Sequence, residues 1–255
     1  MGQRAFQGAT SGRGRGLTSE VGIEQDENFE EVPEEEAGRV LRVFRAFPAG
    51  GTGAARTAQQ RFAMKALSWV RGGGGLSAGD LARELQEGLG DMAWADKGWR
   101  GLAQAQALWV ASGSSQKLAK ALGECAQHVG EPLEREMLLV RAALQMLVTA
   151  RVPTALPGRV RLCVELRAEY SKVLGAQLDL RSPMMQYLDF FMKAVQKGSG
   201  PLAHVVHTNY RPLLDADPTI ASWSENVIDV LEGRVRAGPG GPGGIADMMK
   251  ALMGG

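Results

Sequence analysis

The strongest constraint on the fold of this chain comes from residues 182–218, where apolar side chains recur with helical spacing on more than one face. A first stripe follows the spacing i, i+4, i+7 and i+11 and consists of Met184, Leu188, Phe191 and Val195. A second apolar face of the same segment consists of Tyr187, Phe190 and Ala194. A helix at the protein surface buries one apolar face and exposes a polar one. Because this helix is apolar on two faces, we expect it to pack between neighbouring helices.

The second half of this stretch predicts another helix, joined to the first by a Gly-containing turn. Pro201 suits the first turn of a helix, where its missing N–H costs nothing, and Pro212 marks the far end. The apolar stripe of this helix consists of Leu202, Val205, Val206, Tyr210 and Leu213. The stretch is therefore predicted to be a helical hairpin with more apolar surface than two helices bury against each other. Of its side chains, we expect Met184, Leu188 and Leu202 to pack inward.

The rest of the chain shows the same helical period, and no sustained period-2 alternation indicates a strand. Short turns rich in Gly and Pro separate the predicted helices, and Asp217-Pro218 is a helix-start signal with Asp217 as the cap. The predicted helices outside the hairpin span residues 33–47, 56–70, 78–95, 99–111, 114–128, 132–151, 156–174 and 217–231. This pattern predicts an all-α fold, a right-handed α-solenoid of antiparallel helical hairpins that is tetratricopeptide-like but lacks a fixed-period consensus and a β-sheet.

Composition divides the chain into four regions. Residues 1–32 combine a basic, Gly-rich start with an acidic run and are predicted to be disordered. The solenoid is expected over residues 33–232, followed by a Gly/Pro linker at 233–244. Residues 245–255 are expected to form a short apolar tail helix, too small to be stable alone, which should either fray or bind something.

Charge and cysteine usage limit the functions that fit. The formal net charge is +1, so no global field favours nucleic acid. Cys125 and Cys163 lie within helical patterns, which indicates free thiols in a reducing compartment. No apolar run has the length of a membrane span and no secretory signal begins the sequence, so we expect a cytosolic protein.

The sequence offers little catalytic chemistry. His204 and His207 have the spacing i, i+3 that can hold a metal, but no Cys, Asp or Glu shares their helix face, so packing or a solvent-facing role is the preferred interpretation. Gly51-Thr52-Gly53 lacks the strand and the Gly-Lys-Ser/Thr of a phosphate-binding loop. With no nucleophile-elbow motif either, we expect no catalytic residue, no metal and no cofactor; a divergent enzyme with a bound metal is the less favoured alternative.

Three motifs, taken in order, resemble a known family. Ala66-Leu67-Ser68-Trp69 before a Gly run resembles a helix end of the Get-four scaffold, the α-solenoid subunit of the complex that guides tail-anchored membrane proteins to the ER. Residues 134–147, with the core Ala-Leu-Gln-Met-Leu, are similar to a central helix of that family. Residues 206–218, VHTNYRPLLDADP, resemble its Tyr-x-Pro-x-Leu helix end followed by Asp-Pro. The resemblance covers about residues 33–253.

The resemblance implies a non-enzymatic cytosolic adaptor for the entry of tail-anchored proteins into the ER membrane, in which the C-terminal hairpins bind a ubiquitin-like partner. Family members also begin with helical hairpins that dock the targeting ATPase. Here residues 1–32 stand in that place, so we expect those N-terminal helices to be missing and leave ATPase binding open. The 172–182 connection sits where the family can insert an ordered clamp over the partner, and it is short here.

The surplus apolar faces and the resemblance together give the candidate partner-binding residues Leu178, Phe191, Val195, Val206, Tyr210 and Leu214. No nucleic acid and no membrane span are expected. The alternative function from a different class is a generic helical-repeat interaction module of another trafficking complex or of a complex like the proteasome lid.

Overall fold

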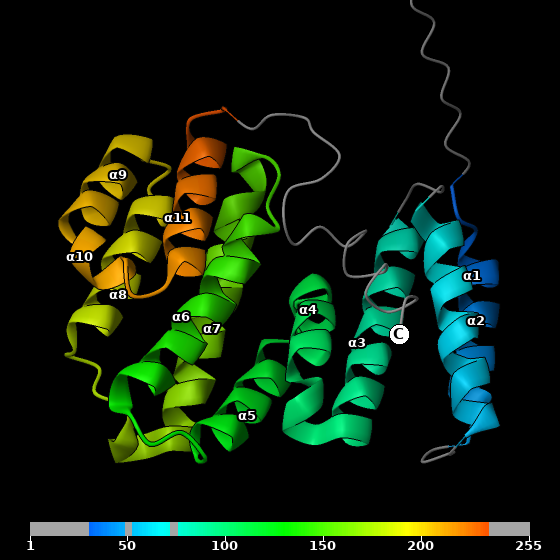
Figure 1. The fold of residues 1–255 in the computed structure, drawn as a ribbon. Helices are drawn as coiled ribbons and strands as arrows, with labels where there is room; N and C mark the ends of the chain where they lie inside the picture. Colours follow the sequence, from blue (N-terminus) through cyan, green and yellow to red (C-terminus); the bar gives the residue numbers. More distant parts are fainter. Residues whose placement is uncertain (1–30, 49–52, 72–75, 235–255) are drawn as a thin grey trace, which may run out of the picture.

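The structure is a computed structural model that describes residues 31–48, 53–71 and 76–234, and in this part of the chain every regular element is a helix (Figure 1). The predicted all-α class is therefore confirmed. The α-helices are α1 (Glu34–Ala46), α2 (Ala54–Arg71), α3 (Leu76–Lys97), α4 (Leu102–Ser112), α5 (Ser115–Ala126), α6 (Pro132–Val148), α7 (Leu156–Leu174), α8 (Pro183–Gln196), α9 (Gly200–Asn209), α10 (Arg211–Leu214) and α11 (Pro218–Leu231). Short 3₁₀ turns lie at Gly98–Gly101, Pro153–Ala155 and Gly175–Gln177.

The region predicted to be disordered falls mostly on residues 1–30, which lie outside the described residues. The same holds for residues 235–244 of the expected linker and for the whole expected tail helix.

One predicted helix, 201–213, is divided into α9 and α10 at Tyr210. In an unbroken helix Pro212 would have no N–H to donate to the Thr208 carbonyl, and its ring would clash with that carbonyl. Tyr210 accordingly leaves the helical region, with φ −98° and ψ 4°. The resulting turn carries the chain towards Asp217, whose side chain accepts a hydrogen bond from the Thr219 N–H at 2.9 Å and begins α11 as predicted.

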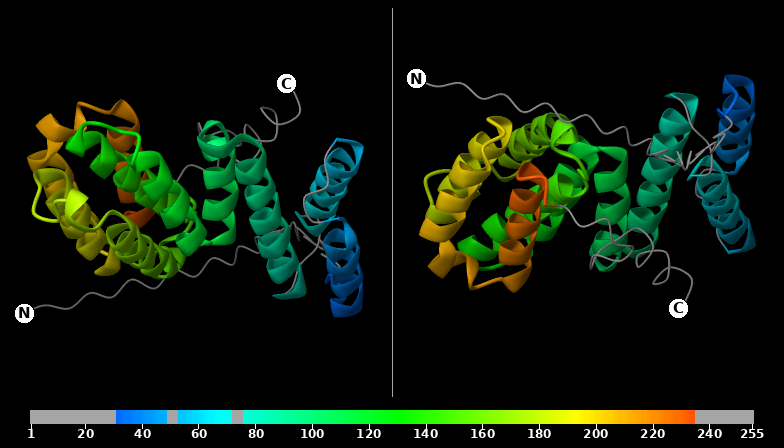
Figure 2. Two further views of the ribbon diagram at one scale, coloured as in Figure 1. Left: turned by 90° about the horizontal axis from the view of Figure 1, so that it is seen from below. Right: turned by 90° about the horizontal axis from the view of Figure 1, so that it is seen from above.

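The helices form a layered, curved array in which α1 and α2 lie at one end and α8 to α11 at the other (Figures 1 and 2). Two hydrophobic cores underlie it. Helices α1 to α3 enclose the smaller core, which includes Leu81 and Leu85. Helices α4 to α11 enclose the larger one. Helices α3 and α4 contribute to both: Ala93 of α3 packs into the larger core, while on α4 Leu108 packs into the smaller core and its neighbour Trp109 into the larger one.

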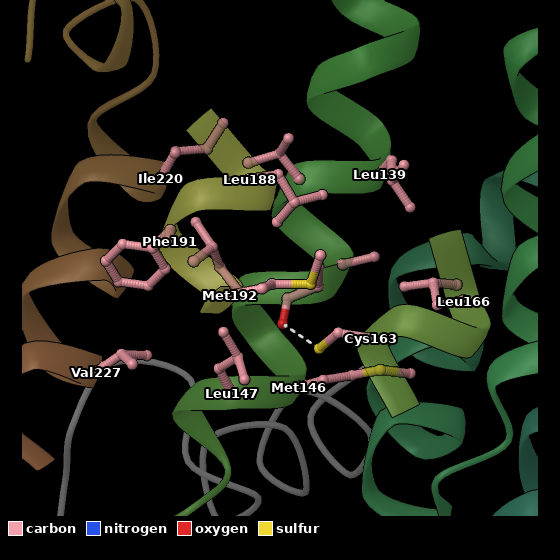
Figure 3. Close-up of a cluster of buried hydrophobic side chains, with 14 of the residues drawn as sticks. Leu139, Met146, Leu147, Cys163, Leu166, Leu188, Phe191, Met192, Ile220 and Val227 are labelled. Carbon is pink, nitrogen blue, oxygen red and sulfur yellow. Dashed lines mark hydrogen bonds between the residues drawn. The ribbon is translucent and has the colours of Figure 1, made fainter. Parts of the chain in front are cut away.

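Helix α6 lies at the centre of the larger core, between α7, α8 and α11 (Figure 3). Leu139 and Leu147 are completely buried, and so is most of the helix between them. On the α7 side the Cys163 thiol donates to the Ala143 carbonyl at 3.3 Å, which satisfies the one polar atom of that side chain. Because α6 contacts three helices at once, its side chains determine where each of them can lie.

Helix α8 is apolar on two faces, as the sequence predicts, but the second face is only partly buried. Tyr187 and Ala194 are in the core, whereas Phe190 is 46% exposed. Phe191, its neighbour, is 0% exposed and contacts the ring of Tyr187 with centroids 5.6 Å apart. The Tyr187 hydroxyl and the Ser224 hydroxyl form a buried hydrogen bond that ties α8 to α11.

The helical spacing of the sequence also places Trp69, Leu133 and Val164 in apolar stripes that should face inward, but in the structure these side chains are exposed. The reason is clearest on α7, where the buried stripe runs through Val160, Cys163 and Leu166. Val164 follows Cys163 by one position, a rotation of about 100° that turns it away from the core.

The carboxylate of Asp217 also forms an ion pair with Arg141, which ties the start of α11 to α6. Burial of Asp217 opposes its charged form, but the hydrogen bonds from Arg141 and from the Thr219 N–H outweigh this and lower the pKa of the carboxyl. The ion pair uses the Oδ2 atom of Asp217 and the cap uses its Oδ1 atom, so one carboxylate serves both contacts.

The adjacent phenylalanines of α8 provide a matched stability test. We expect Phe191→Ala to lower the free energy of unfolding by about 3–5 kcal/mol, because it opens a cavity against Tyr187 in the core. The exposed neighbour is the control, and Phe190→Ala should cost less than about 1 kcal/mol. Urea unfolding followed by circular dichroism measures both, and equal losses would contradict the assignment of Phe191 to the core.

Asp217 should make stability depend on pH. Its pKa is lower in the folded than in the unfolded chain, so its contribution is present above the unfolded value of about 3.9 and is lost as the pH falls below it. Asp217→Ala should cost about 0.5–2 kcal/mol at pH 7 through loss of the cap alone. Asp217→Asn keeps a cap acceptor and is the control. Urea unfolding at several pH values checks this, and a parent curve parallel to that of Asp217→Asn below pH 4 would refute it.

Candidate functional site

The clearest apolar hollow on the described surface is a groove between α8 and α9, with a volume of about 410 Å³. We call it the α8–α9 groove; its lining residues are Phe190, Lys193, Gln196, Lys197, Leu202 and Val206. Phe190 and Leu202 are the large apolar side chains of this set that are most exposed, at 46% and 39%. The groove therefore exposes apolar surface that the fold leaves uncovered.

Local capping and turn residues hold the two walls of the groove in place. The Ser182 hydroxyl accepts a hydrogen bond from the Met185 N–H at 3.2 Å at the start of α8. The Ser199 hydroxyl accepts one from the Leu202 N–H at 3.3 Å at the start of α9. Between them Gly198 has φ +65°, a left-handed conformation that a glycine adopts without strain. The tight turn brings Phe190 and Leu202 to opposite sides of one hollow.

Two lysines give the groove a positive rim. The Lys193 ammonium lies 5.7 Å from the centroid of the Phe190 ring, within the range of a cation–π interaction. Lys197 follows one turn later on the same side, and none of the six lining residues is acidic. The groove thus combines an apolar floor with a cationic edge.

A second, polar hollow lies between α9 and α11, and its charged groups are paired with one another. Arg211 donates to Asp215 at 2.8 Å and to Glu225 at 3.1 Å. The buried His207 places its Nε2 3.5 Å from a Glu225 carboxylate oxygen. Burial lowers the pKa of His207, although the nearby Glu225 charge opposes the shift, so the ring is held in its neutral form.

The polar hollow does not gather the ligands of a metal centre. His207 is buried and packs within the fold, while His204 is exposed to solvent, so each of the two roles predicted for this pair is taken by one of them. Within residues 31–48, 53–71 and 76–234, no three His, Cys, Asp or Glu side chains come together as a metal site. Burial raises the pKa of the Cys163 thiol to about 12, which keeps it protonated and unreactive at neutral pH.

The structure places most of the predicted partner-binding side chains in the core. Leu178, Phe191, Val195 and Leu214 are buried. Tyr210 is half-buried, with its ring centroid 5.6 Å from that of Tyr187.

Val206, at 9% exposure, is the one member of the predicted set that lines the α8–α9 groove. The inward orientation expected for Leu202 was wrong, and so was the outward orientation expected for Phe191 and Leu214. The physical reason is that α6, α7 and α11 pack against one face of the hairpin formed by α8 and α9, and that face carries Phe191.

The positions of apolar residues alone do not identify the side chains that line the groove. The charged residues on the same side of the helix do. Phe190, Lys193 and Lys197 have the spacing i, i+3 and i+7 and occupy one side of α8. Lysines rarely lie in a core, so this spacing marks the Phe190 side as facing solvent. Val205, which is exposed on α9, likewise shares its side with the polar His204 and Thr208.

In the described part of the chain, no helix combines the length and the apolar character that crossing a bilayer requires.

Three comparisons with known proteins bear on identity. A search of curated proteins finds no match. A search of solved structures finds a chain described as the crystal structure of C. therm. Get4, with 18% sequence identity and a TM-score of 0.49, aligned over 89% of this chain and 92% of that chain. The sequence itself matches the model of a family described as Golgi to ER traffic protein 4 over residues 24–253. Because this match covers most of the sequence, the chain belongs to the Golgi to ER traffic protein 4 family.

Proposed function

We propose that this protein is a non-enzymatic cytosolic scaffold in the guided entry of tail-anchored proteins into the ER membrane, and that it binds a ubiquitin-like partner through the α8–α9 groove. The family match over residues 24–253 carries the proposal, since the family is one of Golgi-to-ER traffic. It also favours this function over a generic helical-repeat module of a complex such as the proteasome lid. Docking of the targeting ATPase stays a prediction of the resemblance.

The groove indicates the chemistry of the segment that it would bind. Its floor is formed by Phe190, Leu202 and Val206, which suit apolar side chains presented by a helix or an extended segment. Lys193 and Lys197 at the rim suit carboxylates. The partner segment is therefore expected to carry apolar anchors flanked by Asp or Glu.

Of the six residues predicted to bind the partner, those other than Val206 act indirectly in this proposal. Leu178, Phe191, Val195 and Leu214 lie in the larger core, where Phe191, Val195 and Leu214 keep α8 and α10 in position. Tyr210 is half-buried at the edge of that core. Direct contact with the partner is assigned to Phe190, Leu202 and Val206.

A charge placed on the groove floor should abolish partner binding. We expect Leu202→Asp to lower recovery of a ubiquitin-like protein with the tagged full chain by at least about tenfold, because the complex would bury an unpaired carboxylate. Native co-purification followed by mass spectrometry measures the loss.

Val164→Asp on α7 is the matched control. Like Leu202, Val164 is an exposed aliphatic side chain, at 53%, but it does not line the groove. It should leave recovery unchanged. Equal recovery with both variants, at equal thermal stability, would remove the groove from the proposal. Co-purification without any ubiquitin-like protein would remove the proposed partner.

The lysine rim predicts a dependence on salt. Exposed charges at the edge of an interface act mainly on the association rate, and salt screens them. We expect the double variant Lys193→Gln and Lys197→Gln to slow association at low ionic strength and to flatten its dependence on salt, with little change in the dissociation rate. Surface plasmon resonance at several salt concentrations measures both rates, and a faster association would indicate a basic partner segment.

A further inference from the structure

The end of α11 lies directly against the start of α9, beside the α8–α9 groove. A Cβ atom added to Gly200 would come within 2.4 Å of the Glu232 Cγ, so the two chain segments are in contact there. Gly200 is two positions from Leu202, which lines the groove. Arg234 reaches α9 as well, because it lines the polar hollow together with His204 and His207. Leu202 and Val206 face the groove from the other side of α9, so the chain continues towards its C-terminus from a point one helix width away from the groove.

The sequence beyond Arg234 has enough length to return to the groove. Residues 235–244 separate Arg234 from the apolar segment, and ten residues span at most about 33–36 Å when extended. Helix α9, which forms one wall of the groove, has ten residues and is about 15 Å long. Every part of the groove is thus within reach.

The segment at 245–253 has the pattern of a helix that docks with one face. Its apolar residues follow the spacing i, i+3, i+4, i+7 and i+8 and are Ile245, Met248, Met249, Leu252 and Met253. Asp247 lies on the opposite side of that pattern. Three of the five apolar residues are methionines, whose flexible thioethers adapt to irregular apolar surfaces.

We propose that residues 245–253 occupy the α8–α9 groove of their own chain and compete there with the partner. Docking would cover Phe190, Leu202 and Val206 with the apolar stripe, in the manner of a helix laid into a groove. The competition, unlike the docking, rests on the proposed function.

A weak contact suffices for this arrangement. A short flexible linker gives a tethered segment an effective concentration of about a millimolar. An intrinsic dissociation constant in the same range therefore leaves the groove about half occupied, and still lets a tighter partner displace the segment. The segment would raise the apparent dissociation constant of the partner without preventing partner binding.

Photo-crosslinking of the full chain tests the docking. A p-benzoylphenylalanine placed at position 190, an exposed site on the groove, should crosslink within the same chain to residues 245–255. Tryptic mass spectrometry identifies the product through the peptide 237–250 or the residues that follow it. Mixing isotope-labelled and unlabelled protein distinguishes crosslinks within a chain from those between chains.

A pair of adjacent substitutions provides the control. Leu252→Asp puts a charge on the apolar stripe and should lower the crosslink yield by at least about tenfold. Ala251→Asp adds the same charge beside the stripe and should change the yield by less than about twofold. Absence of a crosslink to residues 245–255, equal yields from the two variants, or a crosslink mainly between chains would each overturn the docking.

Partner affinity tests the competition separately. The full chain with Leu252→Asp should bind the ubiquitin-like partner about 2- to 10-fold more tightly than the parent, because the competing segment is removed. An unchanged affinity alongside a positive crosslink overturns the competition. If no ubiquitin-like partner exists, the proposed function fails, while the crosslink still decides whether the segment docks.

Discussion

The C-terminal part of the structure depends on the near-complete burial of α6. Its side chains contact α7, α8 and α11 together, so a shift of α6 would disturb three interfaces at once. Two polar side chains are paired across these same interfaces: Tyr170 donates to the Arg135 carbonyl of α6 at 2.8 Å, and Arg141 of α6 reaches the cap of α11. Apolar packing supplies most of the stabilisation, and these hydrogen bonds fix which arrangement of the helices is adopted.

The groove follows from the same constraint. Helix α8 can present only part of its surface to α6, so Phe191 fills the core while Phe190 remains at the surface. The tight turn at Gly198 then brings α9 alongside, and the two helices leave a hollow that no other described helix covers. A single additional helix or strand is the element that would complete this layer. Both the proposed partner segment and the C-terminal segment of the chain meet that description.

The sequence predicted the helices, their order and most of their ends, because helical periodicity and capping signals are local properties. Asp217 and Pro218 begin α11 as expected, whereas Pro212, which was expected at the far end of the hairpin's second helix, lies in the first turn of α10. The orientation of each apolar face is a tertiary property, and it was assigned incorrectly where a helix has two such faces. Phe190 and Phe191 differ by one position, and only the location of α6 decides which of them is buried. The lysines that share a side with Phe190 were the available signal.

Helix α4 has a further consequence for the mechanics of the molecule. Its adjacent residues Leu108 and Trp109 pack into different cores, and α3 likewise contributes Leu85 to the smaller core and Ala93 to the larger one. In a quasi-linear array, such a shared wall is the interface through which neighbouring units share their cooperativity. Trp109 donates a hydrogen bond to Asp91 of α3 at 3.1 Å, so loss of α3 would leave this indole without its partner. The protein is in this sense two cores joined through one pair of helices, and a disturbance of α3 or α4 reaches both of them.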